Sequence, residues 1–232
     1  MAVRIVKSGA RILVTWRRLL LALATIAVAT TAMASPTAPE EGFDYELVDV
    51  APGWPREAGK ITVLETFWYQ CPQCNALLPL IEYWAKRDKN RINFVRIPLS
   101  MRPGFEDQET LYHTLEEIGE AERLHIKVFE AIHVDHQPLK TLTEMADFLE
   151  WYGIPSQRFL EVARSPAVKA RRAAAEAMLA HYKIKSVPVL VVDGRFITSA
   201  TRIGGTHAES VIVTEWLLKR AEAEQRAATK TK

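Results

Sequence analysis

The sequence predicts an α/β fold in which a βαβ unit and a ββα unit are separated by an all-helical insert. Two segments typical of strands, 61–67 and 91–97, enclose a segment with helical periodicity. From 103 to 183 the periodicity is helical throughout, without a strand pattern. Two short strand patterns joined by a turn follow in 187–198, before a last helical segment.

The βαβ unit begins after Tyr45–Val48, whose weak alternation predicts a short edge strand. Ile61–Phe67 is rich in β-branched and aromatic residues and apolar on nearly both faces, which is typical of a central strand. A helix is expected to begin at Pro72, because proline suits the first helical position. Its apolar side consists of Leu77, Leu78, Leu80, Ile81 and Trp84. Arg91–Ile97 is the second strand, so the crossover is expected to be right-handed.

The insert is predicted to hold four or five helices. Expected helical segments are 106–119, 120–134, one from the capping box of Thr141 and Glu144 to near Gly153, and an Ala-rich helix from Ser165–Pro166 to Tyr182. The histidines and the Arg171–Arg172 pair are expected on the solvated surface.

The ββα unit begins with Val187–Val192, a strand pattern that runs into the type I′ turn signal Asp193-Gly194. Arg195–Thr198 is expected to form the returning strand. A capping box of Thr206 and Glu209 then predicts a final helix. Its apolar side is expected to contain Ile212, Trp216 and Leu217.

These elements predict one discontinuous domain formed by residues 43–102 and 184–223, with the helical insert domain at 103–183. The Pro-rich residues 35–42 are expected to be a flexible lead-in, and the charged tail 224–232 is expected to fray. No separate N-terminal dimerisation domain is visible in the sequence, so a monomer is expected.

The first 34 residues have the pattern of a secretory signal peptide. A basic start precedes the apolar run Leu19–Ala29, and small residues in an A-x-A arrangement predict cleavage after Ala34. A retained anchor is the alternative, but the apolar stretch is shorter than the ~20 residues that span a bilayer. Export to the periplasm is therefore expected. Arg17–Arg18 leaves open the choice between the general and the twin-arginine route.

Composition argues against two classes of protein. With 232 residues, 48% hydrophobic and 25% charged, the chain is neither disordered nor of low complexity. The formal net charge is +2, but five of the 30 basic residues lie in the first 18 positions, where there is no acid. The remaining 25 basic residues face 28 acidic ones, so the folded part is weakly acidic and no nucleic-acid partner is expected.

The two cysteines, Cys71 and Cys74, are the residues most indicative of chemistry. A disulfide that closes so short a loop does little to stabilise a fold. A zinc site needs about four ligands, and the nearest downstream histidine, His113, belongs to another element. A c-type haem needs a histidine where Asn75 stands. No metal site is expected, and the pair itself is expected to be redox-active.

The placement of the pair supports thiol–disulfide exchange. Cys71 falls at a helix N-terminus, where free N–H groups and the helix dipole stabilise a thiolate, so we expect it to be the nucleophile. Cys74 lies one helical turn further on the same face and is expected to be the resolving cysteine.

These residues resemble a known family. The strand–CxxC–helix unit is similar to thioredoxin, and the insert between βαβ and ββα resembles the DsbA branch of the thioredoxin-like fold. Four more features agree with this branch: the aromatic run Phe67–Tyr69 before the motif, Pro79 as a helix kink, Glu65 as a buried acid and Val187-Pro188 as a cis-proline loop. The resemblance covers about residues 43–223.

The resemblance implies roles for these residues. Glu65, buried beside Cys74, would have a raised pKa and relay the proton of that thiol. Pro188 would be the cis-proline packed against the sulfurs. Substrate contacts are expected from Val187, Pro72 and Gln73, with the Val187 backbone adding an extended substrate as a short strand.

The implied activity is that of an exported thiol:disulfide oxidoreductase that introduces disulfides into newly secreted polypeptides. Its partners would be reduced, unfolded secreted polypeptides and a DsbB-like, quinone-linked membrane reoxidant, and no cofactor other than the Cys71–Cys74 disulfide is expected. A periplasmic reductase or isomerase is an alternative, as is a metallochaperone that holds Cu(I) between the two cysteines.

One position departs from the DsbA branch, which commonly has histidine where this chain has Gln73. A neutral amide cannot place a cation beside the Cys71 thiolate. The thiolate should then be less stabilised, and the disulfide less oxidising, than with a protonated histidine. The net direction of exchange therefore stays open at this point.

Overall fold

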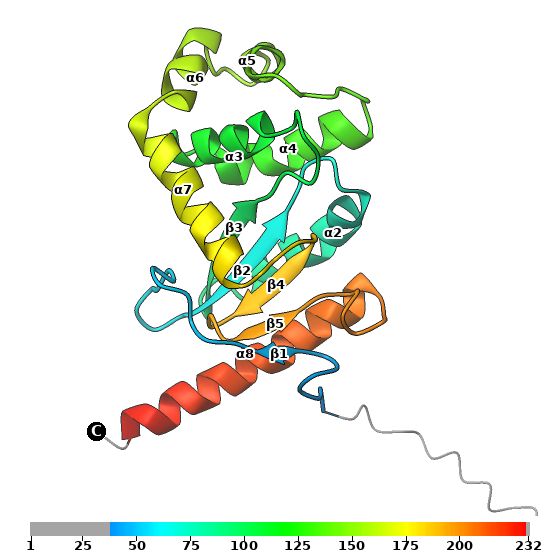
Figure 1. Cartoon of the computed structure of the whole chain (residues 1–232), viewed down its shortest axis with the longest axis vertical. Coiled ribbons are helices and arrows are strands. Elements are labelled where there is room, and N and C mark those ends of the chain that lie inside the picture. The colour runs from blue at the N-terminus through cyan, green and yellow to red at the C-terminus, as the bar shows by residue number, and fades with distance from the viewer. Residues whose placement is uncertain (1–37, 231–232) are drawn as a thin grey trace, which may run out of the picture. The chain divides into compact units, whose positions relative to one another are not determined.

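The computed structural model describes residues 38–230, so the predicted signal peptide lies outside the described residues. A five-stranded sheet in the order β1-β5-β4-β2-β3 forms the centre of the fold (Figure 1). Its strands are β1 (Glu46–Leu47), β2 (Ile61–Phe67), β3 (Ile92–Pro98), β4 (Val189–Val192) and β5 (Phe196–Thr198). The β2–β3 pair is parallel, and the other three pairs are antiparallel.

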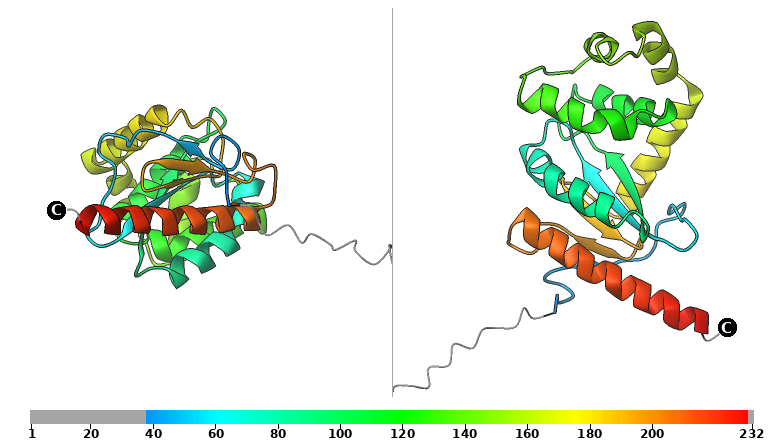
Figure 2. Two further views of the ribbon diagram at one scale, coloured as in Figure 1. Left: turned by 90° about the horizontal axis from the view of Figure 1, so that it is seen from below. Right: turned by 180° about the vertical axis from the view of Figure 1, so that it is seen from behind.

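Strand β2 lies between β3 and β4, and all seven of its residues are buried, as expected for a central strand that is apolar on nearly both faces. Helix α2 (Pro72–Arg87) connects β2 to β3, which confirms the βαβ unit. Helices α2 and α8 (His207–Lys230) cover one face of the sheet, where Leu77 and Leu217 join the core residues of β2 and β4. Figure 2 shows both helices on this side.

The insert contains five helices, the upper end of the range that the sequence predicts. They are α3 (Asp107–Glu117), α4 (Ala121–His133), α5 (Leu142–Glu150), α6 (Ser156–Ala163) and α7 (Pro166–His181). Helix α7 returns along the second face of the sheet, where Ala175 and Leu179 pack on Leu64 and Val191 (Figure 1). The predicted α/β fold with its helical insert is therefore confirmed.

Several predicted signals have the expected geometry. Both hydrogen bonds of the Thr141–Glu144 capping box are present. The Ser165 hydroxyl caps α7. Asp193 and Gly194 have φ angles of 53° and 70°, the left-handed values that a type I′ turn requires.

Helix α5 ends at Glu150, and a turn follows to Gly153, close to the predicted end. Two expectations about side chains on the helices were wrong. His113 and His125 are buried within the insert rather than solvated, because α3 and α4 pack against other helices on more than one side. On α8, Ile212 is 67% exposed, and its neighbour Val213 is the residue that enters the core.

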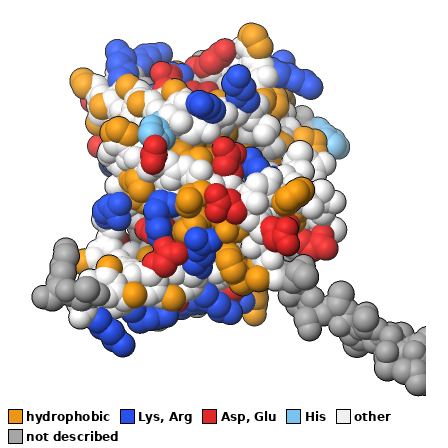
Figure 3. All heavy atoms as spheres, turned by 60° about the horizontal axis from the view of Figure 1, so that its bottom comes forward, with side chains coloured by type: hydrophobic (Ala, Val, Ile, Leu, Met, Phe, Trp, Pro, Cys, Tyr) orange, Lys and Arg blue, Asp and Glu red, His pale blue; other side chains and the backbone are white. Residues whose placement is uncertain are grey.

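The predicted fraying from residue 224 also differs from the structure, since α8 continues to Lys230. Ion pairs stabilise this part of the helix. Glu224 binds Arg195, which precedes β5, at 2.7 Å and Arg220 at 2.9 Å. On the face drawn in Figure 3, basic and acidic side chains are interspersed with hydrophobic ones.

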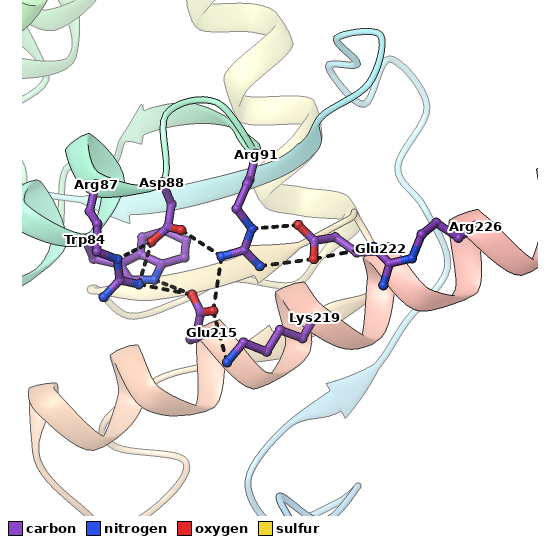
Figure 4. Close-up of polar contacts among 8 residues, drawn as sticks. All are labelled: Trp84, Arg87, Asp88, Arg91, Glu215, Lys219, Glu222 and Arg226. Carbon is purple, nitrogen blue, oxygen red and sulfur yellow. Dashed lines mark hydrogen bonds and ion pairs between the residues drawn. The ribbon is translucent and has the colours of Figure 1, made fainter.

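A network of charged residues fastens α8 to the end of α2 (Figure 4). Arg91 binds both carboxylate oxygens of Glu222, at 2.9 and 3.0 Å, and also contacts the buried Asp88 at 2.7 Å. Glu215 accepts a hydrogen bond of 2.9 Å from the indole N–H of Trp84. Because Arg91 pairs bidentately, the network fixes the orientation of α8 on α2 as well as its distance.

Within residues 38–230, no helix has the length and apolarity needed to cross a membrane.

Candidate active site

The cysteine pair lies where β2 passes into α2. Cys71 is the N-cap residue of α2, and its Sγ accepts a hydrogen bond of 3.4 Å from the backbone N–H of Cys74. Pro72 follows at the first helical position, where a missing N–H costs nothing. Cys71 is 8% exposed and Cys74 1% exposed, and both are free thiols. The helix start thus presents one sulfur near the surface and keeps the other beneath it.

The two thiols differ strongly in acidity. A hydrogen bond from the Cys74 thiol, with the backbone N–H groups of Cys74 and Gln73, lowers the pKa of Cys71 to about 6, although burial opposes this shift. The same hydrogen bond raises the pKa of Cys74, and burial and the nearby Glu65 carboxylate raise it further. At neutral pH the arrangement therefore favours a thiolate on Cys71 and a protonated thiol on Cys74.

The second half of the chain contributes the loop opposite Cys71. The Val187–Pro188 peptide bond is cis, and the Val187 carbonyl oxygen lies 3.7 Å from the Cys71 sulfur. Thr66 at the end of β2 fixes this loop, because its hydroxyl accepts a hydrogen bond of 3.2 Å from the N–H of Val189. The antiparallel pairing of β2 with β4 thereby joins residues more than a hundred positions apart.

The other residues expected to meet substrate lie at the surface. Pro72 and Gln73 are exposed at the first turn of α2. The Gln73 side chain is not free, because its Oε1 lies 2.9 Å from Nε2 of His207 at the start of α8. Pro79 stands inside α2 and is also exposed.

Glu65 is buried in the middle of β2, as its apolar neighbours indicate. Burial raises its pKa to about 7, while the positive charge of Arg96 opposes the shift and the negative charge of Glu82 adds to it. A carboxyl group with such a pKa can take up and release a proton near neutral pH. Its electrostatic effect on the Cys74 thiol places it in range of the pair.

Arg96 is a site residue that the sequence analysis missed. It is the register partner of Glu65 on β3, and its Nε donates to Glu65 Oε2 at 3.2 Å. Its other nitrogens bind Glu82 and Glu122. The sequence signal for this pair was a charged residue in one predicted strand of the βαβ unit and an acid in the other.

The insert holds the residues that lead into the motif. His133 on α4 binds the backbone oxygen of Tyr69 at 2.8 Å, and the Tyr69 hydroxyl lies 3.2 Å from Nδ1 of His125. Gln70 donates to the backbone oxygen of Pro138 at 2.7 Å. The aromatic residues before Cys71 and both cysteines share one buried cluster with the insert helices. Neither histidine was predicted to act here.

Metal ligands are not grouped in the described part of the chain. Between residues 38 and 230, no three His, Cys, Asp or Glu side chains lie together as a candidate set of ligands for a metal ion. The groups that the site brings together are two thiols with opposite pKa shifts, a buried acid and a backbone oxygen facing the more acidic sulfur.

Comparison with known proteins agrees with this geometry. Residues 70–208 match the family described as DSBA-like thioredoxin domain. A relative in Burkholderia cepacia named thiol:disulfide interchange protein DsbA is 35% identical over 167 residues, which cover 72% of this chain and 79% of the relative. The protein of the same name in Pseudomonas syringae pv. tomato is 32% identical over 215 residues, covering 91% and 99% of the two chains.

Solved structures give the same result. The crystal structure of Pseudomonas aeruginosa DsbA has a TM-score of 0.73 at 33% identity, over 81% of this chain and 97% of that chain. The oxidoreductase DsbA from Xylella fastidiosa has a TM-score of 0.73 at 29% identity, over 80% and 99%. Fold, cysteine geometry and similarity over most of the length lead to one conclusion: the chain belongs to the DsbA-like thioredoxin-domain family of thiol:disulfide oxidoreductases.

Proposed function

We propose that this protein is an exported oxidase that transfers the Cys71–Cys74 disulfide to reduced, unfolded polypeptides in the periplasm. The observation that carries the proposal is the unequal acidity of the pair, with the Cys71 pKa lowered to about 6 and that of Cys74 raised. A stabilised Cys71 thiolate favours the reduced form of the protein, so the disulfide is readily passed on.

The exchange runs in two steps. A substrate thiolate attacks the Cys71 sulfur, a mixed disulfide forms, and Cys74 leaves as a thiolate that takes up a proton. A second substrate thiolate then attacks the substrate sulfur of the mixed disulfide, and Cys71 leaves as a thiolate. The substrate loses two electrons and gains a disulfide, while the protein gains two electrons and becomes the dithiol.

Other residues serve these steps. Glu65, with a pKa raised to about 7, supplies the proton that Cys74 takes up. The backbone of Val187, 3.7 Å from the Cys71 sulfur, aligns the substrate as a short strand, and Pro188 closes the loop beneath it. The exposed Pro72 and Gln73 contact the substrate from the helix side. A DsbB-like membrane protein returns the dithiol to the disulfide.

The redox equilibrium with glutathione tests the direction of exchange. An oxidase should be mostly reduced at glutathione ratios that leave an ordinary structural disulfide intact. The oxidised protein should also convert a reduced two-cysteine peptide to its disulfide with equal loss of its own. Replacing Cys71 by Ser should abolish this transfer. If the Cys71–Cys74 pair is mostly in the disulfide form at these ratios, and its dithiol form reduces disulfide substrates, the protein is a reductase and the proposal is overturned.

A further inference from the structure

His207 and Gln73 are 134 positions apart in the sequence but are hydrogen-bonded in the fold. Gln73 stands inside the CPQC motif, next to Cys74, and His207 is the first residue of α8. The distance between His207 Nε2 and Gln73 Oε1 is 2.9 Å. An imidazole from another element therefore contacts the residue of the motif that departs from the common histidine.

The position of His207 is fixed by local structure. It follows the N-cap Thr206, whose backbone N–H donates to the Glu209 carboxylate at 2.6 Å while the Glu209 N–H donates to the Thr206 hydroxyl at 3.2 Å. This reciprocal capping box orders the first turn of α8. The network of Arg91 with Asp88, Glu215 and Glu222 fixes the relative placement of α2 and α8 (Figure 4).

Of the two ring nitrogens of His207, only Nε2 has a hydrogen-bond partner among the described residues, and that partner is Gln73. The other ring nitrogen, Nδ1, is shielded from solvent. An amide oxygen only accepts, so Nε2–H of His207 must donate to Oε1. The hydrogen on Nε2 is present both in the imidazolium and in one neutral tautomer, so the contact does not depend on the charge of the ring.

This contact determines what Gln73 can offer. With Oε1 occupied, the amino group is the end of the side chain that remains free to donate. A hydrogen bond to the oxygen of an amide also polarises the amide. The hydrogen bonds that the N–H groups of the amide donate then become stronger. Gln73 lies in the first turn of α2, two positions after the N-cap Cys71, and its backbone N–H contributes to the acidity of Cys71, so the Gln73 backbone borders that sulfur.

We propose that His207 is a positioning residue of the exchange site: it holds Oε1 of Gln73 so that the Gln73 amino group donates toward the anionic sulfur of Cys71. The pair thereby replaces in part the donor that a histidine inside the motif would supply. The inference rests on the proposed function, because the stabilised sulfur is the leaving group of the oxidase reaction.

The redox equilibrium with glutathione tests this role. Two glutathione thiols are oxidised to one glutathione disulfide, while the Cys71–Cys74 disulfide becomes a Cys71 thiolate and a Cys74 thiol. His207→Ala should lower the equilibrium constant for this reaction by about two- to fivefold, since it removes only the polarising and orienting part of one charge-assisted hydrogen bond. The pKa of Cys71, measured by thiolate absorbance, should rise in the same variant.

A double-mutant cycle separates positioning from a merely structural effect. Gln73→Ala should lower the constant at least as much as His207→Ala, and the double variant should match Gln73→Ala alone. His181→Ala is the control, because that histidine binds the backbone oxygen of Asp49 at 2.9 Å and should leave the constant unchanged.

Two results would overturn the inference: an unchanged constant in His207→Ala, or an equal decrease with and without the Gln73 side chain. Urea unfolding of each variant shows whether the fold is retained. A wild-type constant in the range of a reductase would refute the proposed oxidase function. The cycle would still report whether His207 acts through Gln73, so the two failures are distinguishable.

Discussion

Glu65 and Arg96 are directly opposite each other on β2 and β3 and form an ion pair of 3.2 Å, with side chains only 2% and 3% exposed. The guanidinium also binds Glu82 and Glu122, so one buried cation serves three carboxylates. The acid proposed to serve Cys74 therefore titrates in an environment that is apolar and yet contains a fixed positive charge. Burial raises the pKa of Glu65 more than the positive charge of Arg96 lowers it.

Replacing Arg96 by Met should destabilise the protein strongly. The substitution leaves the buried Glu65 without its counter-charge, and loss of one partner of a buried ion pair costs roughly 3–5 kcal/mol. The loss should be smaller at pH 5 than at pH 8, because Glu65 can then be protonated. Urea unfolding at both pH values measures it. Arg171→Met is the control, since Arg171 pairs with Glu117 at the surface and should lose less than about 1 kcal/mol.

The pH dependence of stability should contain a contribution from Glu65. Its pKa is raised from 4.5 to about 7 in the folded protein, so between these values the folded state holds a proton that the unfolded state has lost. Stability relative to Glu65→Gln should therefore be greatest below pH 4.5 and fall by roughly 3 kcal/mol as pH rises to 7. Parallel unfolding curves of the two proteins across this range would contradict the raised pKa.

His125 should act on stability in the opposite direction. Burial lowers its pKa well below 6.5, and the charge of Arg96 adds to this effect, so the folded state keeps the ring neutral. The unfolded state gains a proton below pH 6.5. Wild-type stability relative to His125→Gln should then fall by roughly 1.5–2 kcal/mol between pH 6.5 and 5. Urea unfolding of both proteins at pH 6.5 and pH 5 measures this difference.

The thiol of Cys74 should be the main determinant of Cys71 acidity. Its hydrogen bond is the largest cause of the lowered Cys71 pKa, so Cys74→Ala should raise that pKa from about 6 by one unit or more. Cys74→Ser retains a hydroxyl donor and should raise it less. The pH dependence of alkylation, with thiolate absorbance, measures both. Equal pKa values in the two variants would assign the shift to the helix start instead.

Much of the fold was predictable because its signals are local. The seven residues of β2 are apolar on nearly both faces, and the strand has the predicted bounds. The capping boxes and the turn at Asp193-Gly194 depend on neighbours within a few positions, so the sequence suffices to place them.

The contacts that the sequence did not predict involve distant partners. Arg96 meets Glu65 across 31 positions, and His207 meets Gln73 across 134. His125 is buried on α4 although the charged residues of that helix are exposed, and periodicity cannot distinguish an enclosed polar residue from a solvated one. The tail from residue 224 was expected to fray because the partner of Glu224, Arg195, lies in the loop before β5, far away in the sequence.

The topology of the sheet has a consequence for the order in which the site forms during synthesis. Strand β4, which carries the loop opposite Cys71, lies between β2 and β5, and the start of α8 binds the first turn of α2. A chain that is delivered from its N-terminus therefore presents both cysteines long before their surroundings exist. Until residue 187 has been made, Cys71 lacks its neighbouring carbonyl, and until residue 207 has been made, Gln73 lacks its imidazole. The start of α2 supplies the local causes of the Cys71 acidity, but the surface that faces the pair arises only when the second half of the fold is complete.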